Sequence, residues 1–132
     1  MITLTVRVRP VVPLEAELVS PDVTATLAND AIRALPVQLG KRQCRLDDFF
    51  TVAGEASDEI QIAGDVSRVK WIGRDMTRGR IHIDGDAGMH LGAYMKGGTI
   101  EVTGSVTDWL GAEMSGGVIR VRGNAGGQVG AA

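Results

Sequence analysis

The chain has 132 residues, a length that favours one domain with a modest hydrophobic core. Its 14 basic and 16 acidic residues give a formal net charge of −2, which argues against nucleic acid or an anionic membrane surface as a partner. The single cysteine, Cys44, cannot form an intrachain disulfide, and a buried, unreactive thiol is its expected role.

The N-terminal stretch from Met1 to Ser20 alternates apolar and polar side chains and lacks the basic and apolar regions of a signal peptide. No apolar run approaches the roughly 18 residues that a membrane span requires. We therefore expect a cytoplasmic protein that does not enter a membrane.

The composition changes near residue 58. All four prolines but only two of the 18 glycines precede this point. The difference predicts an N-terminal cap segment over residues 1–58 and a repeat region over residues 59–132.

In the cap segment, the alternation of Ile2, Leu4, Val6 and Val8 predicts a strand with one buried face. The next expected element is a short helix that begins at Ser20 or Asn29 and ends before Pro36. A hairpin around Gly40 and Lys41 follows, and then Phe49 and Phe50 are expected in the core.

From Glu59 onward the chain repeats itself with a period of 19. Each repeat contains an Ile-x-Ile or Ile-x-Val pair, as in Ile81/Ile83 and Ile100/Val102, and Met76, Met95 and Met114 mark the same period. Turn positions are expected at ten recurring glycines: Gly64, Gly73, Gly79, Gly85, Gly92, Gly98, Gly104, Gly111, Gly117 and Gly123.

A period of this length is typical of solenoids, and the alternating aliphatic pairs indicate strands rather than helices. The expected fold class is therefore mainly β: a right-handed parallel β-helix with glycine corners, preceded by a small N-terminal α+β cap. Because the fourth repeat stops before its methionine, the repeat region is expected to be incomplete at residue 132.

The pattern predicts no catalytic, cofactor or metal site in this chain. His82 and His90 fall in different columns of the repeat, so a shared metal site is not expected. His82, Glu101 and Arg120 follow one another in one column, which favours cross-strand charge pairing. Asp75, Asp84 and Asp86 lie near turns, where aspartate caps backbone groups.

A second column carries aromatic residues. Trp71, His90 and Trp109 occupy equivalent positions, and Tyr94 lies nearby. These four residues predict a partner interface, with partial burial under the N-terminal segment as the equally weighted alternative.

Two long segments carry a family resemblance. The phrase from "VPLEAELVSPDV" to "RLDDFFTVAGE", followed by "GDAGMHLGAYMKGG" and "SVTDWLGAEMSGG", resembles the C subunit of formylmethanofuran dehydrogenase and the gamma subunit of the bacterial formyltransferase/hydrolase complex. The glycine-rich half is also similar to the C-terminal GXGXG-repeat domain of the large glutamate synthase subunit.

The resemblance implies a non-catalytic scaffold subunit in C1 metabolism. Its partners would be amidohydrolase-like and formyltransferase-like subunits, which move a formyl group between tetrahydromethanopterin and a methanofuran-type carrier and release formate. Methanofuran, tetrahydromethanopterin and zinc, molybdenum or tungsten would then belong to those partners. The C subunit of a molybdenum or tungsten formylmethanofuran dehydrogenase, and a stand-alone structural or binding β-helix, remain alternatives.

Overall fold

The structure is a computed structural model that describes residues 1–107 and 110–124, and it is built mainly from short strands. The strands are β1 (Ile2–Val6), β2 (Leu14–Glu15), β3 (Pro36–Leu39), β4 (Arg42–Arg45), β5 (Phe50–Ala53), β6 (Glu59–Ala63), β7 (Val69–Lys70), β8 (Arg80–Asp84), β9 (Thr99–Val102) and β10 (Val118–Val121). The helical elements are α1 (Pro21–Thr24), α2 (Asn29–Arg33) and a 3-10 turn (Leu46–Asp48). Among the described residues, no helix combines the length and the apolar character that a membrane span requires.

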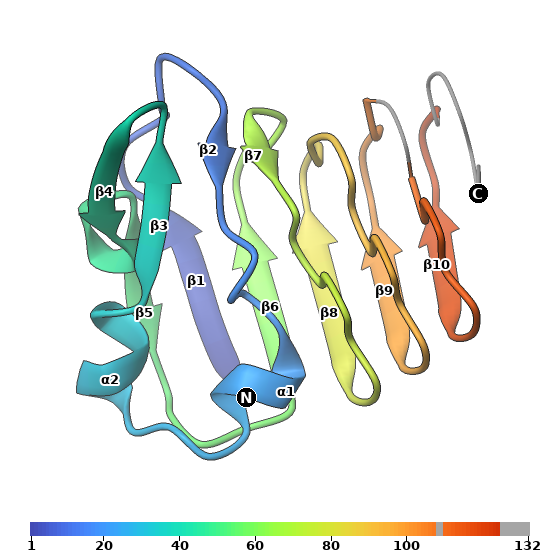
Figure 1. The fold of residues 1–132 in the computed structure, drawn as a ribbon, viewed down its shortest axis with the longest axis horizontal. Coiled ribbons are helices and arrows are strands. Elements are labelled where there is room, and N and C mark those ends of the chain that lie inside the picture. The colour runs from blue at the N-terminus through green and yellow to red at the C-terminus, as the bar shows by residue number, and fades with distance from the viewer. Residues whose placement is uncertain (108–109, 125–132) are drawn as a thin grey trace.

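One sheet of six strands runs through the whole molecule in the order β10-β9-β8-β6-β1-β5. Strands β6, β8, β9 and β10 come from successive repeats and pair in parallel, side by side (Figure 1). Their register places Ile60, Ile81, Ile100 and Ile119 opposite one another. One period of the sequence therefore corresponds to one step across this sheet.

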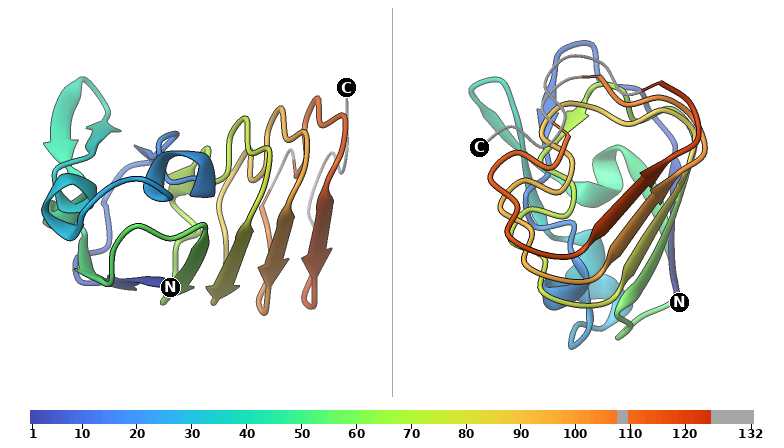
Figure 2. Two further views of the ribbon diagram at one scale, coloured as in Figure 1. Left: turned by 90° about the horizontal axis from the view of Figure 1, so that it is seen from below. Right: turned by 90° about the vertical axis from the view of Figure 1, so that its right-hand side faces the viewer.

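The rest of each repeat folds back over the sheet through turns. Seen end-on, the successive repeats follow nearly the same path around a common interior (Figure 2). The strands send Ile60, Ile81 and Ile100 into this interior, and all three are at most 2% exposed. A continuous aliphatic core thus separates the sheet from the turns.

The predicted fold class, a right-handed parallel β-helix behind a small α+β cap, is wrong. The structure contains two mixed sheets: β1 is parallel to β6 but antiparallel to β5, and in the second sheet, ordered β4-β3-β2-β7, β3 is antiparallel to both neighbours. The N-terminal segment extends the six-stranded sheet because Ile2 and Leu4 on β1 present the same buried alternation as the repeats. Its strands β2, β3 and β4 form the second sheet with β7.

The turn face, which is the side of the repeats that lies opposite the six-stranded sheet, also lacks the regular strands that a parallel β-helix requires. Outside β6, β8, β9 and β10, the described repeat residues form β-pairs only in β7 and in the isolated bridges of Val66 with Ala87 and of Ala87 with Val106. Left-handed residues recur on this face and interrupt any extended run. The repeats therefore contribute one principal strand each.

Several local predictions are confirmed. The Gly40–Lys41 turn joins β3 to β4, and Phe49 and Phe50 are buried. Two helical turns replace the single helix: Ser20 precedes α1, whereas Asn29 is the first residue of α2 rather than its cap. Val8 is not on the buried face but 47% exposed, because the backbone amides of Arg7 and Val8 both turn to the carbonyl of Phe49 and end the strand.

Candidate functional site

The turn face of the repeats is built on residues in the left-handed region. The glycines Gly73, Gly92 and Gly111 have φ between +64° and +74°. Five larger residues share this conformation: Trp71 (φ +70°), Asp75 (+59°), His90 (+60°), Tyr94 (+59°) and Glu113 (+60°). Each non-glycine residue in the left-handed conformation costs roughly 1–2 kcal/mol of conformational free energy, so the surrounding contacts must impose this backbone on the repeats.

Two of these residues form an aromatic stack. The rings of Trp71 and His90 lie 4.3 Å apart between centroids, at an interplanar angle of 8°. Both side chains are half-buried. Burial, assisted by the positive charge of Lys70, lowers the pKa of His90 from its ordinary value of 6.5. The neutral imidazole is therefore the favoured partner of the indole.

Arg74 connects this stack to a second aromatic ring and to the N-terminal segment. Its guanidinium carbon lies 4.9 Å from the Trp71 ring centroid and 5.5 Å from that of Tyr94. The Nη1 atom donates to Glu17 Oε2 at 2.6 Å, and the Nε atom lies 3.7 Å from Asp75 Oδ2. We call Glu17, Trp71, Arg74, His90 and Tyr94 the Arg74 cluster.

The structure brings together three of the four predicted interface residues. Trp71 and His90 are half-buried, whereas Tyr94 is 41% exposed. Trp109 lies outside the described residues. The sequence analysis missed Arg74 and Glu17, although one signal was present: Arg74 occupies the repeat position that Ala93 and Ala112 fill in the next two repeats.

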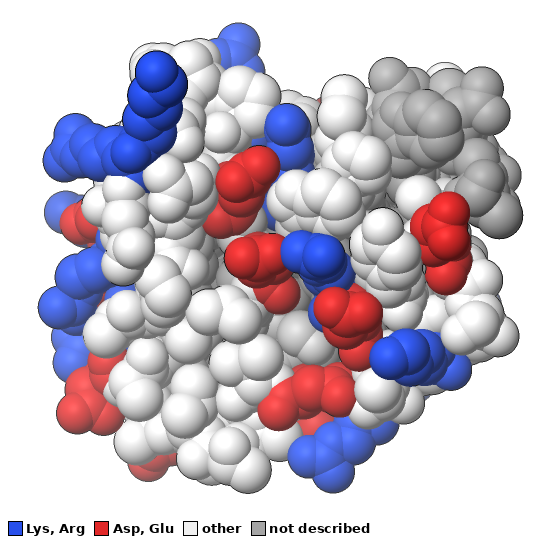
Figure 3. Space-filling view, viewed as in Figure 1, with Lys and Arg blue, Asp and Glu red and all other residues white. Residues whose placement is uncertain are grey.

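Mixed charge surrounds the Arg74 cluster. Figure 3 shows acidic and basic side chains interspersed over the turns of the repeats, whereas Lys and Arg gather at the left edge beside β3 and β4. The turn face therefore has no single electrostatic sign to select an anionic or cationic ligand.

The opposite face of the repeats carries the column that contains His82. Strand register places Gln61, His82, Glu101 and Arg120 in line. Glu101 approaches Arg80 at 3.8 Å and Arg120 at 3.9 Å; both arginines are largely solvent-exposed, and Glu101 is half-buried. At these distances and exposures each pair contributes little stability, but the order of charges along the column is fixed.

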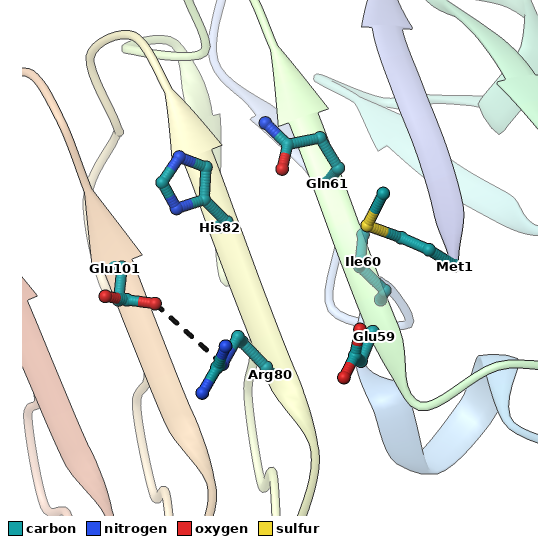
Figure 4. A pocket seen from close by; sticks show the side chains of 7 residues that line it. All are labelled: Met1, Glu59, Ile60, Gln61, Arg80, His82 and Glu101. Carbon is teal, nitrogen blue, oxygen red and sulfur yellow. Dashed lines mark ion pairs between the residues drawn. The ribbon is translucent and has the colours of Figure 1, made fainter.

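A shallow cavity of about 200 Å³ opens beside this column. Figure 4 shows the side chains that line it on neighbouring strands, with the ion pair between Arg80 and Glu101 at its edge. The lining residues are Met1, Glu59, Ile60, Gln61, Arg80, His82 and Glu101. Because most of these polar side chains stand on a flat strand surface, they do not converge on one point as a catalytic site requires.

Of the aspartates predicted to cap turns, Asp86 bonds a backbone amide, whereas Asp84 is the last residue of β8 and bonds a side-chain hydroxyl, and Asp75 pairs with the Arg74 side chain. Asp86 Oδ1 accepts the backbone amide of Ser105 at 2.8 Å, and Asp84 Oδ1 accepts the hydroxyl of Thr103 at 3.2 Å. His82 and His90 face different surfaces, and residues 1–107 and 110–124 contain no group of three His, Cys, Asp or Glu side chains placed to hold a metal ion.

The turn glycines meet two different constraints. Eight of the ten have positive φ, from +64° at Gly111 to +149° at Gly85. The other two, Gly104 and Gly123, lie against backbone or polar atoms, since an added Cβ would stand 2.2 Å from Asp86 Oδ1 or 2.6 Å from the carbonyl oxygen of Gly104. Positive φ disfavours a side chain, and the close neighbouring atoms leave no room for a Cβ atom unless they shift.

Fold and site together define a repeat-built β domain whose recurring residues serve turns and core. No family model matches the chain. Curated relatives do match it. The chain is 43% identical, over 97 residues, to the C subunit of the tungsten-containing formylmethanofuran dehydrogenase 2 of Methanothermobacter thermautotrophicus. This alignment covers 70% of the chain and 36% of the relative. The chain is 50% identical over 83 residues to the C subunit of the molybdenum-containing formylmethanofuran dehydrogenase 1 of the same organism, covering 61% of this chain and 21% of the relative.

A solved structure is also similar. A chain of the formyltransferase/hydrolase complex of Methylorubrum extorquens, crystallised with methylofuran, superposes with a TM-score of 0.88 and 30% identity, covering 94% of this chain and 47% of that one. The resemblance predicted from the sequence is thus confirmed: the chain is a homologue of the formylmethanofuran dehydrogenase C subunit and resembles a component of the formyltransferase/hydrolase complex. It spans about a third of the length of the first of these curated relatives.

Proposed function

We propose that the chain acts as a non-catalytic scaffold in a cytoplasmic formyltransferase/hydrolase complex. In this role it holds partner subunits that move a formyl group between tetrahydromethanopterin and a methanofuran-type carrier and release formate. The observation that carries the proposal is the superposition on the Methylorubrum extorquens complex over 94% of the chain, at a TM-score of 0.88.

The roles of the polar side chains support a scaffold. Asp84 and Asp86 accept hydrogen bonds between adjacent repeats, Arg74 connects the N-terminal segment to the turn face, and Glu101 bridges two arginines. Each of these contacts joins neighbouring strands or turns. The polar chemistry of this chain therefore serves to hold a long, regular surface in a fixed shape.

A second candidate is the C subunit of a molybdenum- or tungsten-containing formylmethanofuran dehydrogenase. Sequence identity favours it: 43% and 50% to the two Methanothermobacter thermautotrophicus subunits, against 30% to the chain of the formyltransferase/hydrolase complex. In both candidates the carriers and any zinc, molybdenum or tungsten belong to partner subunits. The two therefore differ in the partners that the scaffold holds.

The test is purification of the chain from its host with an affinity tag, followed by mass spectrometry of the associated subunits and metal analysis. Amidohydrolase-like and formyltransferase-like subunits without molybdenum or tungsten are the expected result. Stoichiometric molybdenum or tungsten would instead establish the dehydrogenase. A tagged chain that elutes alone from intact host extract would overturn both candidates.

A further inference from the structure

The loop between β1 and β2, residues 7–13, exposes a cluster of apolar side chains. Val8, Val11 and Val12 are 47%, 80% and 43% exposed, and they are three of the six large hydrophobic residues that the described part of the chain exposes. Single exposed apolar side chains are ordinary on a protein surface, but three within five consecutive positions indicate a contact surface. Figure 1 shows that this loop projects at the upper edge of the molecule.

The β1–β2 loop is held in place by bonds to the rest of the molecule. The backbone amide of Arg7 donates to the carbonyl of Phe49 at 2.8 Å. Arg68 Nη1 donates to the carbonyl oxygen of Val11 at 2.8 Å, and Pro10 is buried. A loop that is already ordered loses little conformational entropy when it binds, so these contacts favour a docking role.

A shallow cavity with arginine side chains lies beside the valines. It has a volume of about 270 Å³ and is lined by Arg9, Pro10, Val11 and Arg68. Arg9 Nη2 donates to Asp65 Oδ2 at 2.6 Å. Arg68 bonds the neutral carbonyls of Pro10 and Val11, and it makes no ion pair among the described residues. Because a guanidinium carries several N–H donors, this cavity can accept a further carboxylate.

The β1–β2 loop lies far from the end of the sheet at β10. Strands β6, β8 and β9 separate β1 from β10 in the six-stranded sheet. At a spacing of about 4.8 Å between strands, β1 lies on the order of 20 Å from β10. Leu14, which follows the loop, pairs with Val69 of the first repeat. The neighbours of the loop are therefore the N-terminal segment and the first repeat, both of which the structure describes.

We propose that the β1–β2 loop docks against a partner subunit that offers an apolar depression to Val11 and Val12 and an Asp or Glu carboxylate to the cavity beside Arg68. The inference rests on the scaffold function proposed above and adds the surface that holds one partner. Burial of the valines supplies the contact area. The carboxylate fixes the orientation, because a guanidinium pairs with a carboxylate in a defined planar geometry.

Charge and side-chain size favour this occupant over a second copy of the chain or a lipid surface. Two copies joined through this loop by a twofold axis would place the Arg9 and Arg68 side chains of both copies together, so that like charges oppose one another. Interfacial membrane anchors combine Trp, Phe or Leu with several basic residues. This loop offers valines instead, and the chain carries a net charge of −2.

Binding of loop variants to the partner subunits provides the test. The subunits recovered with the tagged wild-type chain are separated from it and titrated with each variant. Val11→Asp should weaken binding about tenfold, whereas Val11→Leu, which keeps the apolar surface, should change it less than about twofold. Both variants should keep the wild-type melting temperature, because Val11 is 80% exposed.

The outcomes separate this inference from the scaffold function. Wild-type affinity of a folded Val11→Asp chain for every recovered subunit would overturn the docking role of the loop and leave the scaffold function standing. Absence of any subunit bound to the wild-type chain would overturn the scaffold function, and this inference with it.

A second variant tests the charge. Arg68→Gln keeps a donor for the carbonyl of Val11 but removes the positive charge. It should weaken binding about threefold at about 50 mM salt and much less at about 500 mM, because salt screens the lost attraction. An unchanged affinity at low salt would exclude a carboxylate in this cavity and overturn the proposal.

Photocrosslinking identifies the occupant directly. The photoreactive residue p-benzoylphenylalanine, introduced in place of Val12 in the full chain in its host, should crosslink to a partner-subunit peptide that contains Asp or Glu beside apolar residues. A crosslinked peptide without a carboxylate would overturn the proposal. Crosslinks to a second copy, to a segment of the same polypeptide outside residues 1–132, or to lipid would also overturn it, because each identifies a different occupant.

Discussion

The repeat region and the N-terminal segment contribute strands to the same sheets, but they are held in place in different ways. In residues 59–124, columns of like residues stack from repeat to repeat, as Met76 on Met95 and Ile81 on Ile100. Residues 1–58 join this stack through β1, whose Ile2 and Leu4 pair with the first repeat. The rest of the segment adds contacts that occur only once, such as Glu17 with Arg74 and Asp22 with Thr77. The stability of the repeats is therefore spread over equivalent contacts, whereas the irregular part of the N-terminal segment depends on contacts without an equivalent.

This difference explains why glycine is needed at the repeat turns. At Gly98 (φ +87°) an added Cβ would lie 2.7 Å from Met76 Cε and 2.9 Å from the carbonyl oxygen of Gly79. The methionine column of one repeat thus fills the space that the glycine column of the next leaves open. A side chain at one turn displaces the core of the preceding repeat.

Among the substitutions considered, Gly98→Val should therefore cause the largest loss of unfolding free energy. Backbone strain at positive φ and overpacking against Met76 together cost about 3 kcal/mol or more of unfolding free energy. Urea denaturation followed by circular dichroism measures this loss. Gly117→Val, at the less covered last described repeat, is expected to be less damaging, because Met95 Cε can move into the more open side.

Gly40→Ala is the matched control in the N-terminal half. Gly40 has a similar φ of +60°, but an added Cβ would meet nothing within 4 Å. Only the backbone strain remains, about 1 kcal/mol. If Gly40→Ala and Gly98→Val lowered stability equally, the stacked columns would not be the reason for glycine in the repeats.

Asp22→Ala breaks a single contact of the N-terminal segment. The Asp22 carboxylate accepts hydrogen bonds from the backbone amide and the hydroxyl of Thr77. Because this carboxylate is exposed, their loss should cost about 1 kcal/mol, measured by denaturation at pH 7. Thr77→Val, which keeps the backbone bond, should cost less; an equal or larger cost would contradict this assignment.

The same contact predicts an acid dependence. Partial desolvation acts to raise the pKa of Asp22, but the hydrogen bonds from the side chain and backbone of Thr77, together with the backbone amide and the positive charge of Arg78, outweigh it, so the pKa is lowered from 3.8. The stabilisation is therefore complete above pH 3.8 and is lost as the pH falls through the lowered value. Below that range the wild type and Asp22→Ala should differ little in stability.

The bond between Glu17 and Arg74 should have a smaller effect. The two side chains are 55% and 35% exposed, so a double-mutant cycle with Glu17→Ala and Arg74→Ala should give a coupling of about 0.5 kcal/mol. Arg74→Lys keeps the charge but loses the planar contact with Trp71 and Tyr94. It should therefore retain the coupling to Glu17 and still be less stable than the wild type; full wild-type stability would exclude a role for the aromatic rings.

His90 is expected to give the smallest effect, and one that depends on pH. Since its folded pKa lies below 6.5, the unfolded chain binds more protons, and the wild type should lose stability as the pH falls through 6.5. His90→Asn removes the titration and suits the left-handed backbone, so its melting temperature should change less between pH 7 and pH 5. NMR titration of Lys70→Ala should show a raised His90 pKa, and an unchanged value would exclude Lys70 as a cause.

The sequence was sufficient for the features that depend on periodicity. A fixed period requires equivalent residues to stack, so the pairing of Ile81 with Ile100 and the line of His82, Glu101 and Arg120 followed directly. The hairpin at Gly40 was also predictable, because its signal lies within the turn itself. Each of these features is specified by residues that are neighbours or exact repeats.

Only the tertiary structure decided how the irregular half joins the regular one. Nothing in the sequence indicates that β1 lies between β6 and β5 with opposite pairings, because partner choice depends on burial shared by segments far apart in the chain. The Arg74 cluster could not be predicted for the same reason: Glu17 and Arg74 are 57 residues apart in the sequence, and Glu17 is not part of the repeat. Periodicity fixes neighbours within a stack, while contacts between unlike segments are set by three-dimensional packing.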